Sequence, residues 1–205
     1  MNRITFTNGG MKMKAVLNWG TVLVYAGIIM VACRVTSDDD GGTATLSLAK
    51  FENGEISGWN ANPEANPKAK NGIAAFNASD MLDMVNGGAP AYTAKGMLEG
   101  FEQNMIKGEQ LYKSWVMDFG TEAHAKEMYD SKVQEFSNED STGSYPIAKA
   151  FVRSSDYGYD GYAIFGRYMV VLWLDGFGAN LSEAKNKTIE FLQTIEMKLK
   201  ELKLI

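Results

Sequence analysis

An apolar segment near the N-terminus divides the chain and limits what the remainder can fold into. Residues 15–32 read AVLNWGTVLVYAGIIMVA, with Lys12 and Lys14 just before them. A basic stretch followed by an apolar stretch has the layout of a signal peptide. Its removal leaves residues 33–205, the size of a single domain. A domain of this size buries about 70% of the surface that its unfolded chain exposes, so a core can form without metal or disulfides.

The sole cysteine of the chain stands directly after this apolar segment. The sequence Met30, Val31, Ala32, Cys33 resembles the lipobox of bacterial lipoproteins, in which small or aliphatic residues precede an invariant cysteine. The resemblance implies that a signal peptidase cuts before Cys33 and that this residue carries diacylglycerol and a further acyl chain such as palmitate. Two or three acyl chains are enough for stable attachment to a membrane.

The predicted organisation has three parts. Residues 1–32 form the signal peptide, with Met11 or Met13 as alternative translation starts. Residues 33–45 form a tether, because three consecutive aspartates repel one another and two glycines remove stiffness. Residues 46–205 form one folded domain. The alternative for the apolar segment is an uncleaved transmembrane helix, since its 18 residues just reach the length that spans a bilayer.

The charge of the chain limits the class of partner. The formal charge is −5, and the sequence contains no stripe of Lys and Arg that could neutralise a phosphate backbone. We therefore do not expect nucleic acid as a partner. The expected partners are the membrane, through the lipid on Cys33, and a protein or glycan of the cell envelope.

Hydrophobic periodicity predicts an α+β fold. Residues 97–106 and 110–119 show alternating apolar positions on either side of residues 107–109, which predicts a β-hairpin. Residues 168–174 are apolar throughout, as is typical of a central strand covered on both faces. Residues 181–202 repeat apolar side chains every three or four positions and predict a long helix.

Weaker signals complete the predicted fold. Three more strands are expected over residues 46–51, 148–152 and 162–165. Residues 60–71 are expected to form a surface loop, and two short helices follow it, one capped by Ser79 and one over residues 89–95 that Gly96 ends. Thr121 caps a longer helix. The predicted architecture is an antiparallel sheet of about five or six strands, with the long C-terminal helix and the shorter helices packed on it.

A short signature within the predicted domain resembles an uncharacterised bacterial family of secreted and lipid-anchored proteins. The signature is Asn-Gly-Gly-Ala-x-x-Tyr, matched here by residues 86–92, and the family carries a Gly-Trp pair upstream, matched by Gly58 and Trp59. The resemblance covers nearly all of residues 47–202. It implies an exported single domain and no known activity.

The same signature supplies one group of candidate ligand-binding residues. Asn86, Gly87 and Gly88 can present backbone amides to an anion, and Tyr92 follows them closely. The alternative role is steric, because glycines let the chain turn sharply so that Tyr92 can pack.

A tyrosine-rich segment supplies the second group. Tyr157 and Tyr159 can stack against a sugar or a peptide. The alternative is an ordinary loop between two strands.

Few residues can support catalysis. The single histidine, His124, lies about 100° around its predicted helix from the apolar stripe, so we expect it in solvent. One histidine and a lipidated cysteine leave no nucleophile–base pair and no His-rich zinc site, and no catalytic residue, metal or cofactor is expected. The preferred prediction is a non-enzymatic binding or scaffold domain, held by lipid on the cell membrane or outer membrane and facing away from the cytoplasm. The alternative is an enzyme that acts on an envelope polymer through an acidic pair such as Asp156 and Asp160.

Overall fold

The chain has two compact units, Met1–Asp39 and Asp40–Ile205. The computed structural model describes residues 6–8, 11–13, 45–66, 68, 72–84, 88–136, 150–154 and 158–205. In the first unit, β1 (Phe6–Asn8) pairs antiparallel with β2 (Met11–Met13). The apolar part of the predicted signal peptide, residues 15–32, and Cys33 lie outside the described residues. In the part of the chain that is described, no helix is both long enough and apolar enough to cross a membrane.

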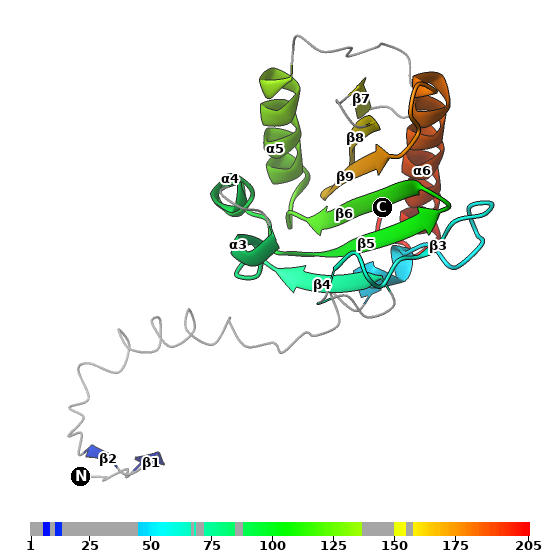
Figure 1. The fold of residues 1–205 in the computed structure, drawn as a ribbon. Helices are drawn as coiled ribbons and strands as arrows, with labels where there is room; N and C mark the ends of the chain where they lie inside the picture. The colour runs from blue at the N-terminus through cyan, green and yellow to red at the C-terminus, as the bar shows by residue number, and fades with distance from the viewer. Residues whose placement is uncertain are drawn as a thin grey trace. The chain divides into compact units, whose positions relative to one another are not determined.

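One antiparallel sheet forms the centre of the second unit (Figure 1). Its strands are β3 (Asn60–Ala61), β4 (Ile73–Asn77), β5 (Glu99–Lys107), β6 (Gln110–Asp118), β7 (Ala150–Ser154), β8 (Gly158–Phe165) and β9 (Tyr168–Asp175). β3 and β4 pair with successive parts of β5, and the order then runs β5, β6, β9, β8, β7. The described strands therefore occupy six positions, which confirms the predicted antiparallel sheet.

Helices cover both faces of this sheet (Figure 1). The long helix α6 (Leu181–Glu201) packs on one face, called here the α6 face. The opposite face, called the α5 face, is covered by α5 (Glu122–Glu135) with the short helices α3 (Met81–Met84) and α4 (Ala89–Ala94). Successive side chains of a strand point to opposite faces, so each central strand contributes to both cores. The α+β prediction is confirmed.

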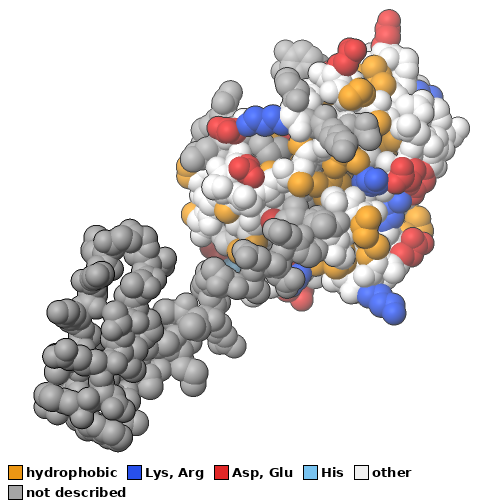
Figure 2. Space-filling view, turned by 90° about the horizontal axis from the view of Figure 1, so that it is seen from below, with side chains coloured by type: hydrophobic (Ala, Val, Ile, Leu, Met, Phe, Trp, Pro, Cys, Tyr) orange, Lys and Arg blue, Asp and Glu red, His pale blue; other side chains and the backbone are white. Residues whose placement is uncertain are grey.

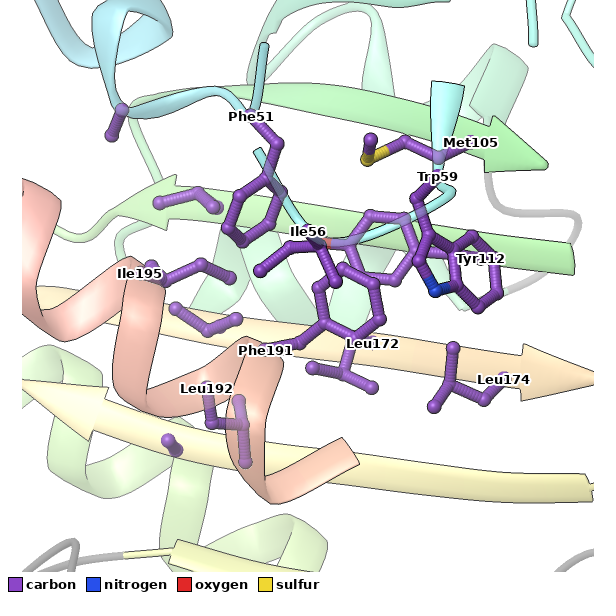
Figure 3. Packing of buried hydrophobic residues seen from close by; sticks show 14 of the residues in the cluster. Phe51, Ile56, Trp59, Met105, Tyr112, Leu172, Leu174, Phe191, Leu192 and Ile195 are labelled. Atoms are coloured by element: carbon purple, nitrogen blue, oxygen red, sulfur yellow. The ribbon is translucent and has the colours of Figure 1, made fainter. Parts of the chain in front are cut away.

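The α6 face has an aromatic core (Figure 3). Phe191 of α6 stacks on Tyr112 of β6 with ring centroids 4.2 Å apart. Phe51 and Trp59 meet the Phe191 ring edge-on, at centroid distances of 5.3 and 5.4 Å. Aromatic pairs in such geometries each contribute about 0.5–1.5 kcal/mol beyond their buried area. Through these two rings, residues 51–59, which precede the first strand of the sheet, pack against helix α6.

The strongest sequence signals are confirmed. β5 and β6 form the predicted hairpin, and β9 lies between β6 and β8 with both faces covered. The helix α6 begins after Asn180, whose Oδ1 accepts the Glu183 N–H at 3.3 Å. Helix α5 begins after Thr121, whose hydroxyl accepts the His124 N–H at 3.2 Å. Both caps satisfy amides that have no partner within the helix.

The strand predicted over residues 46–51 was wrong. Ser47–Ala49 form a short 3-10 helix, η1, and the chain continues from it without pairing to a strand. Leu46 and Ala49 are spaced by three residues and turn toward the same core. The Gln103 side chain takes the place of a strand partner, because its amide accepts the Phe51 N–H at 2.9 Å and donates to the Phe51 carbonyl at 2.8 Å.

Two smaller predictions also need correction. The predicted surface loop over residues 60–71 begins with the two-residue strand β3, and the strand β4 that follows it was not predicted. Asn77, rather than Ser79, organises the turn before α3, since its Oδ1 accepts the N–H groups of Ser79 and Asp80 at 2.8 and 3.2 Å. Gly96 has a φ of +84° after α4, as its predicted role in ending that helix requires.

Candidate functional site

A pocket of about 230 Å³ opens where β5, β6 and β9 lie side by side. Three side chains form a row across these strands, because Asn104 pairs in register with Lys113 and Lys113 with Trp173. Asn62 and Ala65, from the segment after β3, form one wall. The remaining lining residues are Met105, Leu111, Tyr112 and Asp175. We call this site the Trp173 pocket.

A buried carboxylate lies next to the pocket. Glu102 is only 2% exposed. Its Oε1 accepts the side-chain N–H groups of Asn66 at 2.9 Å and Asn104 at 2.7 Å. Its Oε2 accepts the indole N–H of Trp115 at 2.8 Å and lies 3.1 Å from the ammonium of Lys113. Each oxygen therefore has two donors, and the Asn66 bond attaches the pocket wall to the sheet.

These contacts decide the charge state of Glu102. Burial raises its pKa, but the hydrogen bonds from Asn104, Trp115 and Asn66 and the positive charge of Lys113 lower it by more. The net effect is a pKa below the ordinary value of 4.5. Glu102 is thus an anion at neutral pH, and it lacks the raised pKa that a general acid needs. Its geometry is that of a residue that positions its neighbours.

Lys113 links this carboxylate to the aromatic floor. Its ammonium lies 5.2 Å from the ring centroid of Trp115 and 5.8 Å from that of Trp173. The two indoles meet edge-on at 4.8 Å with an interplanar angle of 75°. Such cation–π and edge contacts restrict the orientation of both rings. Trp173 stays partly exposed at the floor of the pocket, whereas Trp115 is buried beneath it.

A larger hollow, of about 420 Å³, lies near Phe51 and Ile73. Exposed residues of the segment between η1 and β3, such as Glu52 and Asn53, line much of it. Binding sites are usually apolar hollows with a few convergent polar groups. The Trp173 pocket fits that description better, because an aromatic side chain lies there beside Lys113, whose ammonium is paired with the buried carboxylate of Glu102.

The residues of the predicted glycine signature lie elsewhere. Gly88 is the N-cap residue of α4, and Asn86 and Gly87 lie outside the described residues. Tyr92 is buried, with its ring edge-on to Trp115 at 6.1 Å and the Lys132 ammonium 5.6 Å from its centroid. Burial, with the nearby charge of Glu135, raises the pKa of the Tyr92 hydroxyl well above its usual range. None of the described members of this group lines the Trp173 pocket.

The other predicted residues are also separate from the pocket. Tyr159 is buried on β8 in the core of the α6 face, and Tyr157 lies outside the described residues. Of the acidic pair, Asp160 is buried on β8 and Asp156 is outside the described residues. His124 is exposed, as predicted, and its Nδ1 lies 3.2 Å from the Phe119 carbonyl oxygen.

The sequence also contains a signal for the pocket that hydrophobic periodicity does not reveal. In a hairpin that pairs Lys107 with Gln110, Asn104 must lie opposite Lys113 and Glu102 opposite Trp115. Charged and amide side chains at alternate positions of two neighbouring strands therefore share one face. The contribution of Trp173 requires the pairing of β6 with β9, which the hairpin does not determine.

The space-filling view shows how charge is distributed over one face of the molecule. Acidic and basic side chains are interspersed with apolar ones on the coloured part of that face (Figure 2). The described residues there do not gather into the basic stripe that a phosphate backbone would require.

The fold and the pocket define the class of domain. It is an α+β unit in which helices cover both faces of an antiparallel sheet and a small pocket contains an aromatic side chain. Among solved structures, the extracellular domain of PknH from Mycobacterium tuberculosis is similar, with a TM-score of 0.51 over 78% of this chain and 97% of that chain. Sequence identity is 10%, so the likeness concerns the fold alone. No protein-family model and no curated protein matches the chain. The resemblances to a lipobox and to the Asn-Gly-Gly-Ala-x-x-Tyr family therefore stay predictions.

Proposed function

We propose that this protein is a lipid-anchored protein of a bacterial cell envelope and that its second unit binds a ligand outside the cytoplasm. The observation that carries the proposal is the shared fold with a domain described as extracellular, of which 97% is covered. The position of the only cysteine, directly after an apolar segment, supports a lipid anchor.

Binding is favoured over catalysis by the chemistry of the Trp173 pocket. Glu102, the buried carboxylate beside it, accepts four donors and has a lowered pKa. Asp175 accepts the N–H of Gly176 at 2.5 Å. Carboxylates that are held in this way orient neighbouring groups, whereas a general acid at neutral pH needs a raised pKa. The floor offers instead a partly exposed indole, which suits recognition.

The anchor can be tested by the intact mass of the membrane-extracted protein, with wild type and Cys33→Ala compared. We expect the wild type to have the mass of residues 33–205 plus acyl chains, and we expect Cys33→Ala to keep its first 32 residues and carry no lipid. Protease added to intact cells or spheroplasts should digest the wild-type domain. An uncleaved and unmodified wild-type chain, or a domain protected from protease until the cells are lysed, would contradict the proposal.

A further inference from the structure

We infer that the outer edge of β4 pairs with an extended segment of a partner protein, which places one large apolar side chain in the hollow near Phe51 and Ile73. β4 lies at the border of the sheet, and β5 is its only partner among the described strands (Figure 1). This surface shares no lining residue with the Trp173 pocket, so it adds a second binding surface to the proposed function.

Alternate residues of β4 direct their backbone groups away from β5. The Asn104 N–H of β5 donates at 2.8 Å to the carbonyl of Gly72, the residue directly before β4. In an antiparallel pair, residues that bond to the partner strand alternate with residues that do not. Counted from Gly72, the even-numbered residues of β4 bond to β5. Ile73, Ala75 and Asn77 therefore turn their N–H and C=O groups outward.

Side chains close both ends of this edge. At one end, Oδ1 of Asn53 accepts the N–H of Ala61 in β3 at 2.7 Å. At the other end, Oδ2 of Asp80 accepts the Asn77 N–H at 3.0 Å, and the Asp80 N–H donates to the Asn77 carbonyl at 3.1 Å. A pairing segment can therefore use only the stretch between these two closed ends.

Ile73 and Ala75 form the open part of the edge. Within the described segments, no hydrogen bond outside the sheet reaches their backbone groups, and Ala75 is exposed. β4 contains no charged residue and no proline, which are the residues that usually protect an edge strand from pairing. The open part offers the N–H and C=O groups of both residues. An extended peptide gains its affinity from main-chain bonds to such groups.

The hollow of about 420 Å³ adjoins the open part of the edge, because Ile73 belongs to both. Side chains of directly opposed residues in an antiparallel pair lie on the same face of the sheet. The peptide residue opposite Ile73 therefore extends toward the hollow. A water molecule occupies about 30 Å³ of liquid, so this volume corresponds to about 14 waters and has room for an indole ring.

The lining of the hollow favours an uncharged side chain. Phe51, Ile73 and Pro63 contribute apolar surface. The two charged residues of the lining, Lys50 and Glu52, form an ion pair at 3.3 Å, so neither charge is left to attract an ion. A large aromatic residue combines apolar contact area with a ring that fits the volume.

A second copy of this chain fits the edge less well. Symmetric antiparallel pairing of two β4 strands that uses all the open groups would set Ile73 of each copy opposite Ala75 of the other. The methyl group of an alanine would leave most of the hollow unfilled. A different protein with a large side chain at this position uses both the edge and the hollow.

The test is an NMR titration of the purified, isotope-labelled full chain with the peptide acetyl-Ser-Val-Thr-Trp-Ser-amide. Antiparallel pairing sets its tryptophan opposite Ile73 and its valine opposite Ala75. One control peptide carries N-methyl groups on the tryptophan and the valine, so it keeps both side chains and loses the two donors. A second control peptide has alanine in place of tryptophan.

Two variants of the protein complete the test. Ala75→Pro removes the outward N–H, and proline is accepted in edge strands where its nitrogen faces outward. Ala75→Ser keeps the N–H at the same exposed position and is the matched control. Equal melting temperatures of wild type and both variants establish that the fold is intact. The control peptides carry the test by themselves if Ala75→Pro melts early.

We expect the first peptide to shift the amide signals of Ile73 and Ala75 and to slow their hydrogen exchange. Affinity should fall at least tenfold for each control peptide and for Ala75→Pro, and it should stay unchanged in Ala75→Ser. No binding, or equal binding of the N-methylated peptide, would overturn the inference. Slow exchange of both amides without peptide, or signals that shift with protein concentration, would also overturn it, because the edge would then be occupied by the chain itself or by a second copy.

Discussion

At the scale of single residues, Glu102 shows how the chain retains a charge inside the sheet. Transfer of an isolated carboxylate from water into a protein interior is strongly unfavourable. Here four donors surround the two oxygens, one of them the ammonium of Lys113. Charge-assisted hydrogen bonds are roughly twice as strong as neutral ones, so this arrangement offsets the loss of hydration. Removing the charge while keeping the shape should therefore be costly.

Glu102→Gln is expected to lower the free energy of unfolding by about 2–3 kcal/mol at pH 7, because the new amide group would face donors rather than accept from them. The folded-state pKa of Glu102 is below its ordinary value of 4.5, so its stabilisation is present above pH 4.5 and is lost as pH falls through the folded-state pKa. The difference between wild type and variant should accordingly shrink below about pH 4.5. Urea unfolding from pH 7 to pH 3 measures it.

The control for this series is Glu109→Gln, at an exposed position in the turn between β5 and β6. Surface substitutions of this kind usually change stability by no more than about 0.5 kcal/mol. An effect of Glu102→Gln that stays constant across the pH range would show that the carboxylate charge is not what stabilises this region.

At the scale of elements, α6 packs closely against β8 at Gly161. A Cβ atom at Gly161 would lie 2.6 Å from Cγ2 of Thr188, a distance that real Cβ atoms essentially never show. Thr188 is fully buried, and its hydroxyl donates to the Ala184 carbonyl at 2.9 Å. Position 161 therefore has room only for glycine, and the distance between α6 and β8 depends on the contact between Gly161 and Thr188.

Gly161→Ala alone should lower the free energy of unfolding by about 1–3 kcal/mol through overpacking. Thr188→Ser removes the obstructing methyl group and keeps the hydroxyl, at a cost of about 1 kcal/mol. The double variant should be more stable than the sum of the single effects indicates, and a double-mutant cycle in urea measures this coupling. Additive effects would mean that the methyl group of Thr188 is not the obstacle.

At the scale of the whole molecule, one sheet serves two cores. The clusters on the α6 face and the α5 face are built on the same central strands, and their members all belong to the second unit. Val170 and Val171 are neighbours in β9 and lie in opposite clusters. If one core were lost, one face of the central strands would become exposed to solvent, and the same strands form the other core. We expect the second unit to unfold in a single cooperative step.

A chain that begins at Asp40 should fold and melt within a few degrees of the full chain, because every described residue of the two cores belongs to the second unit. Far-UV circular dichroism and tryptophan fluorescence, which report on helices and on both cores, should give coincident transitions. Separate transitions, or a large drop in the melting temperature of the shorter chain, would show that the second unit is not self-sufficient.

The sequence by itself determined the elements whose apolar residues repeat with a clear period. These are the hairpin of β5 and β6, the covered strand β9 and the long helix α6. The pairing of the two hairpin strands also fixes their register, and this register places Glu102 opposite Trp115. Such elements are predictable because their patterns arise from neighbours in the chain.

Other segments have a conformation that depends on residues far away in the chain, and only the tertiary structure decided it. Phe51 lies in a non-strand segment because Gln103, 52 residues away, satisfies its backbone groups. Asn66, next to Ala65 of the pocket wall, is held in place because Glu102, 36 residues away, accepts its side-chain N–H. Trp173 reaches the floor only through the pairing of β6 with β9. Local periodicity carries no information on contacts of this range, which is why the pocket becomes visible only once the sheet is assembled.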